Sequence, residues 1–148
     1  MKYWIIVATQ EHVARGVAEG IAQIGHGKRA PLTRLQLDDW IIYYSPQVSL
    51  STKTPVQSFT AIGQVKDEDI FKVTVTPEFQ PYRRRINYLG SQVTPIQPLI
   101  EQLKFIRDKK NWGYTLHFGL IGIPKEDFLL IQETMIPTPF ASQAINIE

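Results

Sequence analysis

The sequence contains no cysteine, and this absence excludes two kinds of site at once. Without thiols the chain forms neither disulfide bridges nor thiolate metal centres. Long apolar runs are missing too, because no stretch approaches the roughly 18 apolar residues that a membrane span needs. The apolar run from Tyr3 to Val7 is too short for a signal peptide. Together these absences predict a cytoplasmic protein that does not contact the membrane.

A large excess of charge of one sign is also missing. The chain carries 16 basic and 14 acidic residues, which leaves a net charge of only +2. An excess of this size is common on solvated surfaces and does not by itself identify a nucleic-acid-binding protein. The distribution says more, because Arg83 to Arg85 and Arg107 to Lys110 concentrate positive charge in the second half. Two such clusters are sufficient for a few phosphate contacts.

Patterns typical of metal sites and catalytic sites are absent as well. The three histidines, His12, His26 and His117, show no HxxxH or HExxH spacing, so we expect no metal and no cofactor. The loop from His26 to Lys28 lacks the spacing of a phosphate-binding loop, and Arg29 stands where magnesium would need Ser or Thr. No nucleophile, base and orienting group can be assembled from the sequence, so no catalytic residue is predicted.

What the chain does have is the material for a folded core. Its 148 residues are 43% hydrophobic and 11% aromatic, which predicts a single domain over residues 1–148. Apolar patterning predicts strands and helices. The strands are expected over 3–8, 40–45, 57–65, 70–76, 82–89 and 114–123, and the helices over 10–24, from 94 onward and after Pro124. The order predicts an α+β domain with a mixed, mostly antiparallel sheet, curled into a partial barrel and flanked by helices.

Several local signals refine these elements. Thr9 suits the N-cap of the first helix, and Gly25 or Gly27 is expected to end it with a positive φ. The charged run 66–69 is expected to form a turn between two strands. Thr94 begins a capping-box spacing ahead of a helix. The buried residues expected on the helices are Val13, Val17, Ile21 and Ile24 on the first, Leu99, Leu103 and Ile106 on the second, and Phe128, Ile131 and Met135 on the third. The segment 137–148 lacks periodicity and is predicted to be an irregular tail.

Aromatic residues give the first functional signal. Most of them occupy predicted strands, where core packing is the expected role. The run from Asn111 to Tyr114 differs, because Gly113 separates two large rings at the junction of a loop and a strand. A small residue in that place can leave a ring face open. Stacking of a base on such a face contributes about 1–3 kcal/mol and needs only a flat ligand.

At this point the sequence resembles a known family, the EVE domain. The resemblance is carried by the stretches YWIIVAT, GVAEGIAQIGHGKRAPLTRLQLDDWIIYYSP, QSFTAIGQV, FQPYRRRINYL and PIQPLIEQLKFIRDKKNWGYTLHFGLIGIPKEDFLLI. It spans Tyr3 to about Met135, and HGK-x-APL, YYSP, FTAIG and NWGY occur in the family's order. Two positions depart from the family pattern: Leu37-Asp38-Asp39 replaces a Pro-Gly-Asp turn, and Arg85 and Asn87 make the later strand more basic.

The resemblance implies a PUA-like pseudo-barrel, related to the YTH and SRA readers of modified bases. It further implies a non-catalytic module that binds DNA or RNA and holds a base, expected to be a modified one, in an aromatic pocket. An enzyme acting on nucleotides or nucleic acid and a protein-interaction module on the same fold remain alternatives. Carried over by motif, the expected pocket residues are Trp4, Thr9, Gln23, His26, Gly27, Lys28, Tyr44, Ser45, Asn111, Trp112 and Tyr114.

The resemblance also suggests roles within that set. Trp112 is the expected stacking surface. Hydrogen bonds to the base edge are expected from Thr9, Ser45 and Asn111. Contacts to phosphate are expected from Lys28, Arg84 and Arg85.

Overall fold

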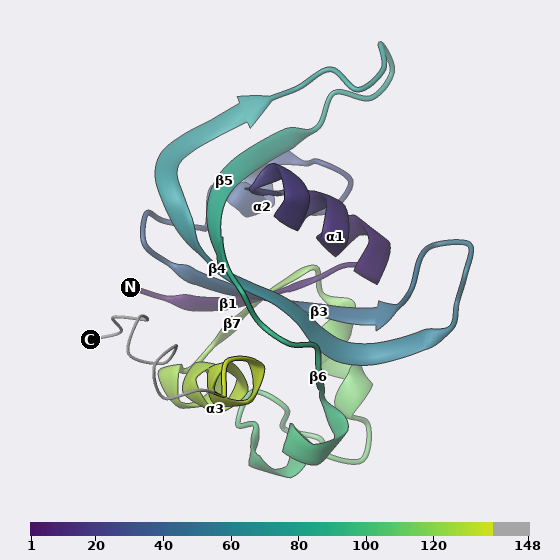
Figure 1. Cartoon of the computed structure of the whole chain (residues 1–148), viewed down its shortest axis with the longest axis vertical. Helices are drawn as coiled ribbons and strands as arrows, with labels where there is room; N and C mark the ends of the chain where they lie inside the picture. The colour runs from purple at the N-terminus through teal and green to yellow at the C-terminus, as the bar shows by residue number, and fades with distance from the viewer. Residues whose placement is uncertain (138–148) are drawn as a thin grey trace.

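A computed structural model of the chain describes residues 1–137, so the predicted tail lies outside the described residues beyond Pro137. Seven strands form one mixed sheet in the order β2-β5-β4-β3-β1-β7, with β6 paired to β4 (Figure 1). Only β1 and β3 pair in parallel, and the other pairs are antiparallel. The elements are β1 Tyr3–Val7, α1 Gln10–Glu19, β2 Ile21–Ala22, α2 Arg29–Leu32, β3 Trp40–Gln47, β4 Pro55–Lys72, β5 Tyr82–Leu89, β6 Thr94–Pro95, the 3₁₀ segments η1 Gln97–Gln102 and η2 Trp112–His117, β7 Leu120–Ile123 and α3 Lys125–Met135.

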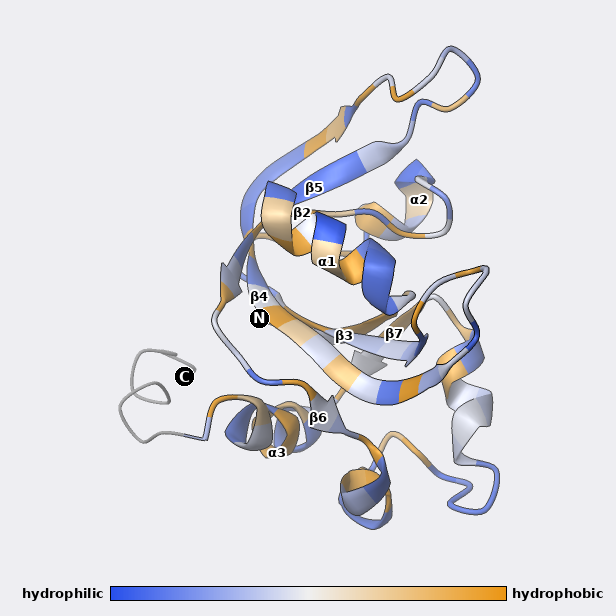
Figure 2. Ribbon diagram, turned by 45° about the vertical axis from the view of Figure 1, so that its right-hand side comes forward, coloured by the Kyte–Doolittle hydropathy of each residue, from blue (hydrophilic) through white to orange (hydrophobic). Residues whose placement is uncertain are grey.

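The sheet buries both of its faces, so the core has two halves. Alternate residues of β1 enter different halves, Tyr3 and Ile5 one and Trp4 and Ile6 the other, as the pleat of a strand requires. Figure 1 shows α1 and α2 on the side toward which β4 and β5 curl, and α3 on the other. Figure 2 shows apolar and polar residues alternating along α1, α3 and the strands of the sheet. This arrangement confirms the predicted α+β pseudo-barrel architecture.

The first helix is shorter than predicted. It begins after the Thr9 N-cap, as expected, but ends at Glu19, where Gly20 adopts φ 70°. Ile21 then pairs with Arg85 as part of β2, and Val17 is exposed instead of buried. The stop signal was Gly20, since a left-handed residue satisfies the last helical carbonyls. Gly25 and Gly27 do have positive φ, but they shape the following loop.

The two strands predicted over 57–65 and 70–76 are one long strand. β4 runs from Pro55 to Lys72, and its pairing with β5 skips between Val65 and Ile70. The charged run 66–69 is therefore an irregularity within a strand and not a turn between strands. An interior group supports it, because the guanidinium of Arg84 donates to the Asp67 carbonyl at 2.9 Å.

Two predictions in the last third of the chain are also wrong. Thr94 does not cap a helix, since it pairs with Phe59 in β6 and is followed by a 3₁₀ segment. The strand expected over 114–123 begins only at Leu120, because η2 occupies the preceding residues. The expected buried residues Leu99, Leu103 and Ile106 are nevertheless buried, as are Phe128, Ile131 and Met135 of α3. In the described part of the chain no helix has the length and hydrophobicity that crossing a bilayer requires.

Candidate functional site

β1 ends at Val7, opposite Tyr44 of the parallel strand β3, and two adjoining depressions open there. We call them the histidine pocket and the tryptophan pocket, and Pro46 lines both. The histidine pocket has a volume of about 550 Å³ and includes Val7, Thr9, His12, Gln23, His26, Gln47, Ser49 and Leu50. The tryptophan pocket has a volume of about 440 Å³ and includes Tyr44, Gln57, Lys110, Asn111, Trp112, Leu116 and His117.

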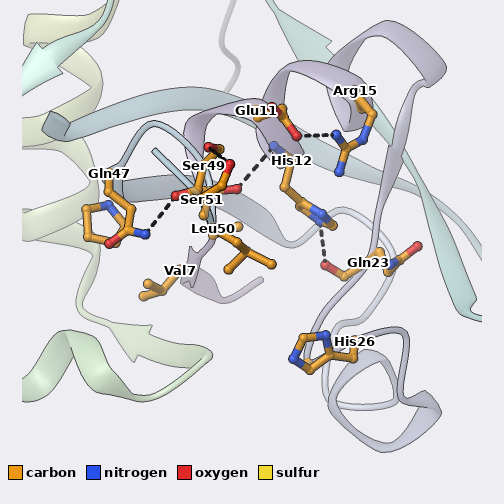
Figure 3. Close-up of a pocket in the computed structure, with 14 residues that line it drawn as sticks. Val7, Glu11, His12, Arg15, Gln23, His26, Gln47, Ser49, Leu50 and Ser51 are labelled. Carbon is orange, nitrogen blue, oxygen red and sulfur yellow. Dashed lines mark hydrogen bonds and ion pairs between the residues drawn. The ribbon is translucent and has the colours of Figure 1, made fainter. Parts of the chain in front are cut away.

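The start of α1 forms one wall of the histidine pocket. The Thr9 hydroxyl accepts the backbone N–H of His12 at 3.3 Å and so begins the helix. His12 then reaches across the pocket, where its Nε2 lies 3.3 Å from the Gln23 carbonyl oxygen (Figure 3). Because a carbonyl only accepts, Nε2 carries the hydrogen and Nδ1 is left as an acceptor. Burial is the main cause that lowers the pKa of His12, so the ring is neutral at pH 7.

The opposite wall is the loop 23–28, which three consecutive positive φ angles fold tightly. Gly25, His26 and Gly27 have φ of 57°, 60° and 82°. The backbone N–H groups of Gly27 and Lys28 both donate to the Ile24 carbonyl at 3.1 Å. A Cβ added to Gly27 would lie 2.2 Å from the Pro81 Cβ. The loop is therefore held against the start of β5 with no room for a side chain at that glycine.

The tryptophan pocket has a different construction. Tyr44 contributes from the end of β3, where it is buried edge-on to Phe59 at 5.8 Å between ring centroids. The other wall comes from the segment after Asp108, whose carboxylate accepts the backbone N–H of Lys110 and of Asn111 at 3.1 and 3.0 Å. The Asn111 side chain also donates to Asp108 at 3.0 Å, and this contact lowers the pKa of that carboxyl. Trp112 is half-buried, so part of its ring remains accessible.

Six of the residues expected at the site are brought to these pockets. Thr9, Gln23 and His26 line the histidine pocket. Tyr44, Asn111 and Trp112 line the tryptophan pocket. Ser45 is fully buried, and its hydroxyl is engaged with Thr60 Oγ1 at 2.8 Å. The Ser45 hydroxyl is therefore not accessible for the expected hydrogen bond to a base edge.

Trp4 lies elsewhere, near the other end of β1. Its ring is 6% exposed, its Nε1 donates to Asp39 at 2.9 Å, and Arg34 lies over the ring at 5.1 Å. It faces the half of the core that contains Ile6 and Val13. The indole is thus a structural anchor and does not line either pocket. Gly27, Lys28 and Tyr114 also stand outside the two linings, although the first two belong to the loop 23–28.

The three expected phosphate contacts differ in accessibility. Arg84 is 3% exposed, and its guanidinium donates to the carbonyls of Leu32, Leu35 and Asp67, so it has no surface to offer a phosphate. Arg85 forms ion pairs with Asp67 at 3.3 Å and Asp69 at 3.7 Å, which already occupy its charge. Lys28 is exposed, and in residues 1–137 it has no ion pair within 4.0 Å.

Sequence reasoning missed several residues that line the pockets. His12 lies three residues after an N-cap threonine, and that spacing could have placed it beside the helix start. No comparable signal marked Pro46, near the end of β3, or Ser49 and Leu50 in the loop that follows. Within residues 1–137 no three histidine or carboxylate side chains are placed to hold a metal ion together.

Comparison with known proteins identifies the family of the chain and its fold. The family model of the EVE domain matches residues 2–134 of the sequence, which confirms the resemblance noted in the sequence. A UPF0310 protein in the gntR 5′ region of Bacillus licheniformis is 49% identical over 128 residues, covering 86% of this chain and 87% of that one. A UPF0310 protein of Mycolicibacterium vanbaalenii is 43% identical over 141 residues, covering 95% and 97%.

Among solved structures, the YTH domain of the Zygosaccharomyces rouxii MRB1 protein, in complex with N6-methyladenosine RNA, superimposes with a TM-score of 0.62. The two chains are 13% identical, and the match covers 89% of this chain and 84% of that one. At this identity the likeness concerns the fold, and it confirms the pseudo-barrel.

Proposed function

The chain belongs to the EVE domain family, and on that premise we propose that it is a non-catalytic nucleic-acid-binding protein that receives one unstacked base at the two pockets. The observation that carries the proposal is the adjacency of the pockets. The half-buried indole of Trp112 lines the pocket on one side of Pro46, and hydrogen-bonding groups line the other, together with the ion pair of Glu11 and Arg15. The RNA bound to the YTH domain of similar fold supports nucleic acid as the ligand class.

Trp112 would provide the stacking surface. Base–aromatic stacking contributes about 1–3 kcal/mol and tolerates any base, so it supplies affinity without selecting the base. Extracting a base from a duplex costs a few kcal/mol, which stacking alone barely offsets. Contacts to phosphate from Lys28 and Lys110 would supply the remainder, since both side chains are exposed at the rims of the site.

Selection among bases would then fall to the histidine pocket. His12 and Gln23 offer hydrogen-bonding groups, while Val7 and Leu50 offer apolar surface. Burying one extra methyl group contributes about 0.8 kcal/mol, roughly fourfold in affinity, so apolar contact alone discriminates weakly. A modified base is read more sharply where the unmodified one leaves a buried polar group without a partner. The combination of both surfaces in one pocket suits a modified base.

The direct test is fluorescence anisotropy with nine-nucleotide single strands of DNA and RNA. The central base would be adenine, N6-methyladenine, cytosine, 5-methylcytosine or 5-hydroxymethylcytosine. We expect Trp112→Ala to weaken binding about 5- to 150-fold. Phe71→Ala is the matched control, because Phe71 is a half-buried ring of β4 that lines neither pocket. Equal weak binding of every strand by wild type and Trp112→Ala would contradict the proposal.

A double-mutant cycle tests whether one base contacts both pockets. If it does, Trp112→Ala and Gln23→Ala are coupled by about 0.5 kcal/mol or more, whereas separate sites give additive losses.

Incubation of the protein with nucleotides, the same strands and divalent metal ions checks the non-catalytic part. Any hydrolysed or modified product would overturn that part and favour the enzyme alternative.

A further inference from the structure

Beside the tryptophan pocket the structure exposes a cluster of rings with no role in the core. Tyr114 is 68% exposed and Phe118 is 57% exposed, although both are large aromatic side chains. Their ring centroids lie 6.3 Å apart with an interplanar angle of 89°. Tyr114 also lies 6.1 Å from the His117 ring, and His117 lines the tryptophan pocket. The ring cluster, Tyr114, His117 and Phe118, is therefore continuous with the proposed base site.

The local conformation explains why these rings point outward. η2 is a 3₁₀ segment, in which residues three apart share a side, and this places Tyr114 with His117. The same segment buries only Leu116. A regular strand, which the sequence had suggested, would have turned alternate residues of this run toward the core. The conformation thus buries Leu116, packs Trp112 partly against the core, and leaves the rings of Tyr114 and Phe118 to solvent.

The charge around the cluster indicates what covers it. Arg107 and Lys110 are exposed, and in residues 1–137 neither has an ion pair within 4.0 Å. The nearby Asp108 carboxylate is already engaged by the backbone of Lys110 and by Asn111. Exposed rings beside uncommitted positive charge are complementary to a strand of bases and phosphates. An uncharged protein surface would leave these cations without partners.

We infer that Tyr114 and Phe118 hold a base next to the one at the pockets, one ring stacking on its face and the other contacting its edge, so that the protein recognises a single-stranded segment of nucleic acid. This inference rests on the proposed function and specifies its substrate. Bases inside a duplex present only their edges, because their faces are covered by neighbouring pairs. A ring cluster outside the pocket can therefore be used only by a strand whose flanking base is unpaired. Lys110 would neutralise a phosphate between the two bases.

The experiment uses the strand of the panel that binds wild type most tightly, in three forms. The first is the intact nine-nucleotide strand, the second carries abasic sites on both sides of the central base, and the third is annealed to its complement. We expect the abasic and duplex forms to bind wild type about 5- to 150-fold more weakly than the intact strand. Tyr114→Ala with Phe118→Ala should remove the difference between the intact and the abasic strand by weakening the intact strand alone, whereas the duplex stays weaker because its central base must still be unstacked. Tyr114→Phe keeps the ring and should bind as wild type does.

Controls separate this inference from the proposed function. Phe71→Ala removes a ring that belongs neither to the two pockets nor to the ring cluster, and it should change nothing. If Trp112→Ala weakens binding but the Tyr114 and Phe118 variants do not, the base site stands and the inference is overturned. If no strand binds, both are overturned. Lys110→Ala should reduce the slope of log affinity against log salt by about 0.7, the value for one phosphate of a single strand, whereas the ring variants leave the slope unchanged.

A second copy of the chain is the competing occupant of an exposed ring cluster. Sedimentation velocity of wild type and the double variant, without nucleic acid, decides this. A monomer in both cases supports the inference. A dimer that dissociates on losing the two rings would overturn it.

Discussion

The two walls of the proposed site are built in opposite ways. The loop 23–28 is fixed by backbone hydrogen bonds and by a glycine that touches Pro81. The segment 108–118 is fixed by side chains: the Asp108 carboxylate, the Lys109 ammonium, which donates to the Ile100 and Leu103 carbonyls at 3.0 and 2.6 Å, and buried Leu116. The first wall is held by its backbone, while the second is held by side chains and exposes the rings of Tyr114 and Phe118. A reader of bases needs both, because selectivity requires a rigid pocket and capture requires accessible rings.

The largest expected effect comes from the glycines of the two walls. Gly27→Ala forces a side chain into a position with φ 82° and against the Pro81 backbone, so we expect a loss of about 2–4 kcal/mol in the free energy of unfolding. Gly113→Ala is the matched change, because no atom lies within 4 Å of a Cβ there, and its effect should stay within about 0.5 kcal/mol. Urea denaturation measures both. Similar losses would remove the contrast between the walls.

A smaller effect is expected where α3 holds the chain just before the segment 108–118, which we call the exposed wall. Buried Asp127 accepts the backbone N–H groups of Lys104 and Phe105 at 2.9 and 2.8 Å. Asp127→Ala leaves both donors without a partner and should lower the free energy of unfolding by about 1–3 kcal/mol. The neighbouring Glu126→Ala removes only an exposed ion pair with Lys104 and should leave the urea midpoint unchanged. An unchanged midpoint for Asp127→Ala would show that this wall has another anchor.

The contact between His12 of α1 and the loop 23–28 also predicts a dependence on pH. Folding lowers the pKa of His12 from 6.5. Between the two pKa values the unfolded chain therefore binds a proton at His12 and the folded chain does not. The free energy of unfolding should therefore fall as pH drops below about 6.5, and the loss is complete below the folded pKa. Urea titrations at several pH values check this. His12→Gln should flatten the curve in that window, and a curve unaffected by the substitution would mean that other groups control it.

The smallest effect is expected at Asp108. Its carboxylate is exposed and holds only the turn at Lys110 and Asn111. Asp108→Ala should leave the thermal midpoint unchanged but accelerate amide hydrogen exchange at those two residues, since stability is lost only locally. Exchange at Gly27 and Lys28 serves as the internal reference. Unchanged exchange at Asn111 would indicate that the exposed wall is as firmly held as the rigid one.

Most regular elements could be predicted because their signals are local. The strand from Tyr3, the Thr9 cap and the helix after Pro124 follow from residues within a few positions of one another. The errors arose where a distant partner decided the conformation. The charged run 66–69 reads as a turn, yet the buried Arg84 guanidinium holds it within a strand. The alternation of Tyr114, Leu116 and Phe118 suits a strand, yet the segment is a 3₁₀ turn.

The candidate site shows the same division. Motif resemblance supplied Gln23, His26, Asn111 and Trp112, and the structure brings them to adjoining pockets. It could not distinguish Trp4 from a pocket residue, because alternation shows that neighbouring residues face opposite sides but not which side is lined by the site. Nor could it separate an accessible arginine from a buried one such as Arg84.

By itself the sequence determined the absence of thiol chemistry, the family, and those elements that depend on neighbouring residues, since propensity and capping act over a few positions. Only the tertiary structure decided that the loop after α1 and the segment after Asp108 line two pockets that share Pro46. It also decided that Tyr114 and Phe118 face solvent. Burial and accessibility depend on long-range strand pairing, and one sequence position does not reveal which distant residues will cover it.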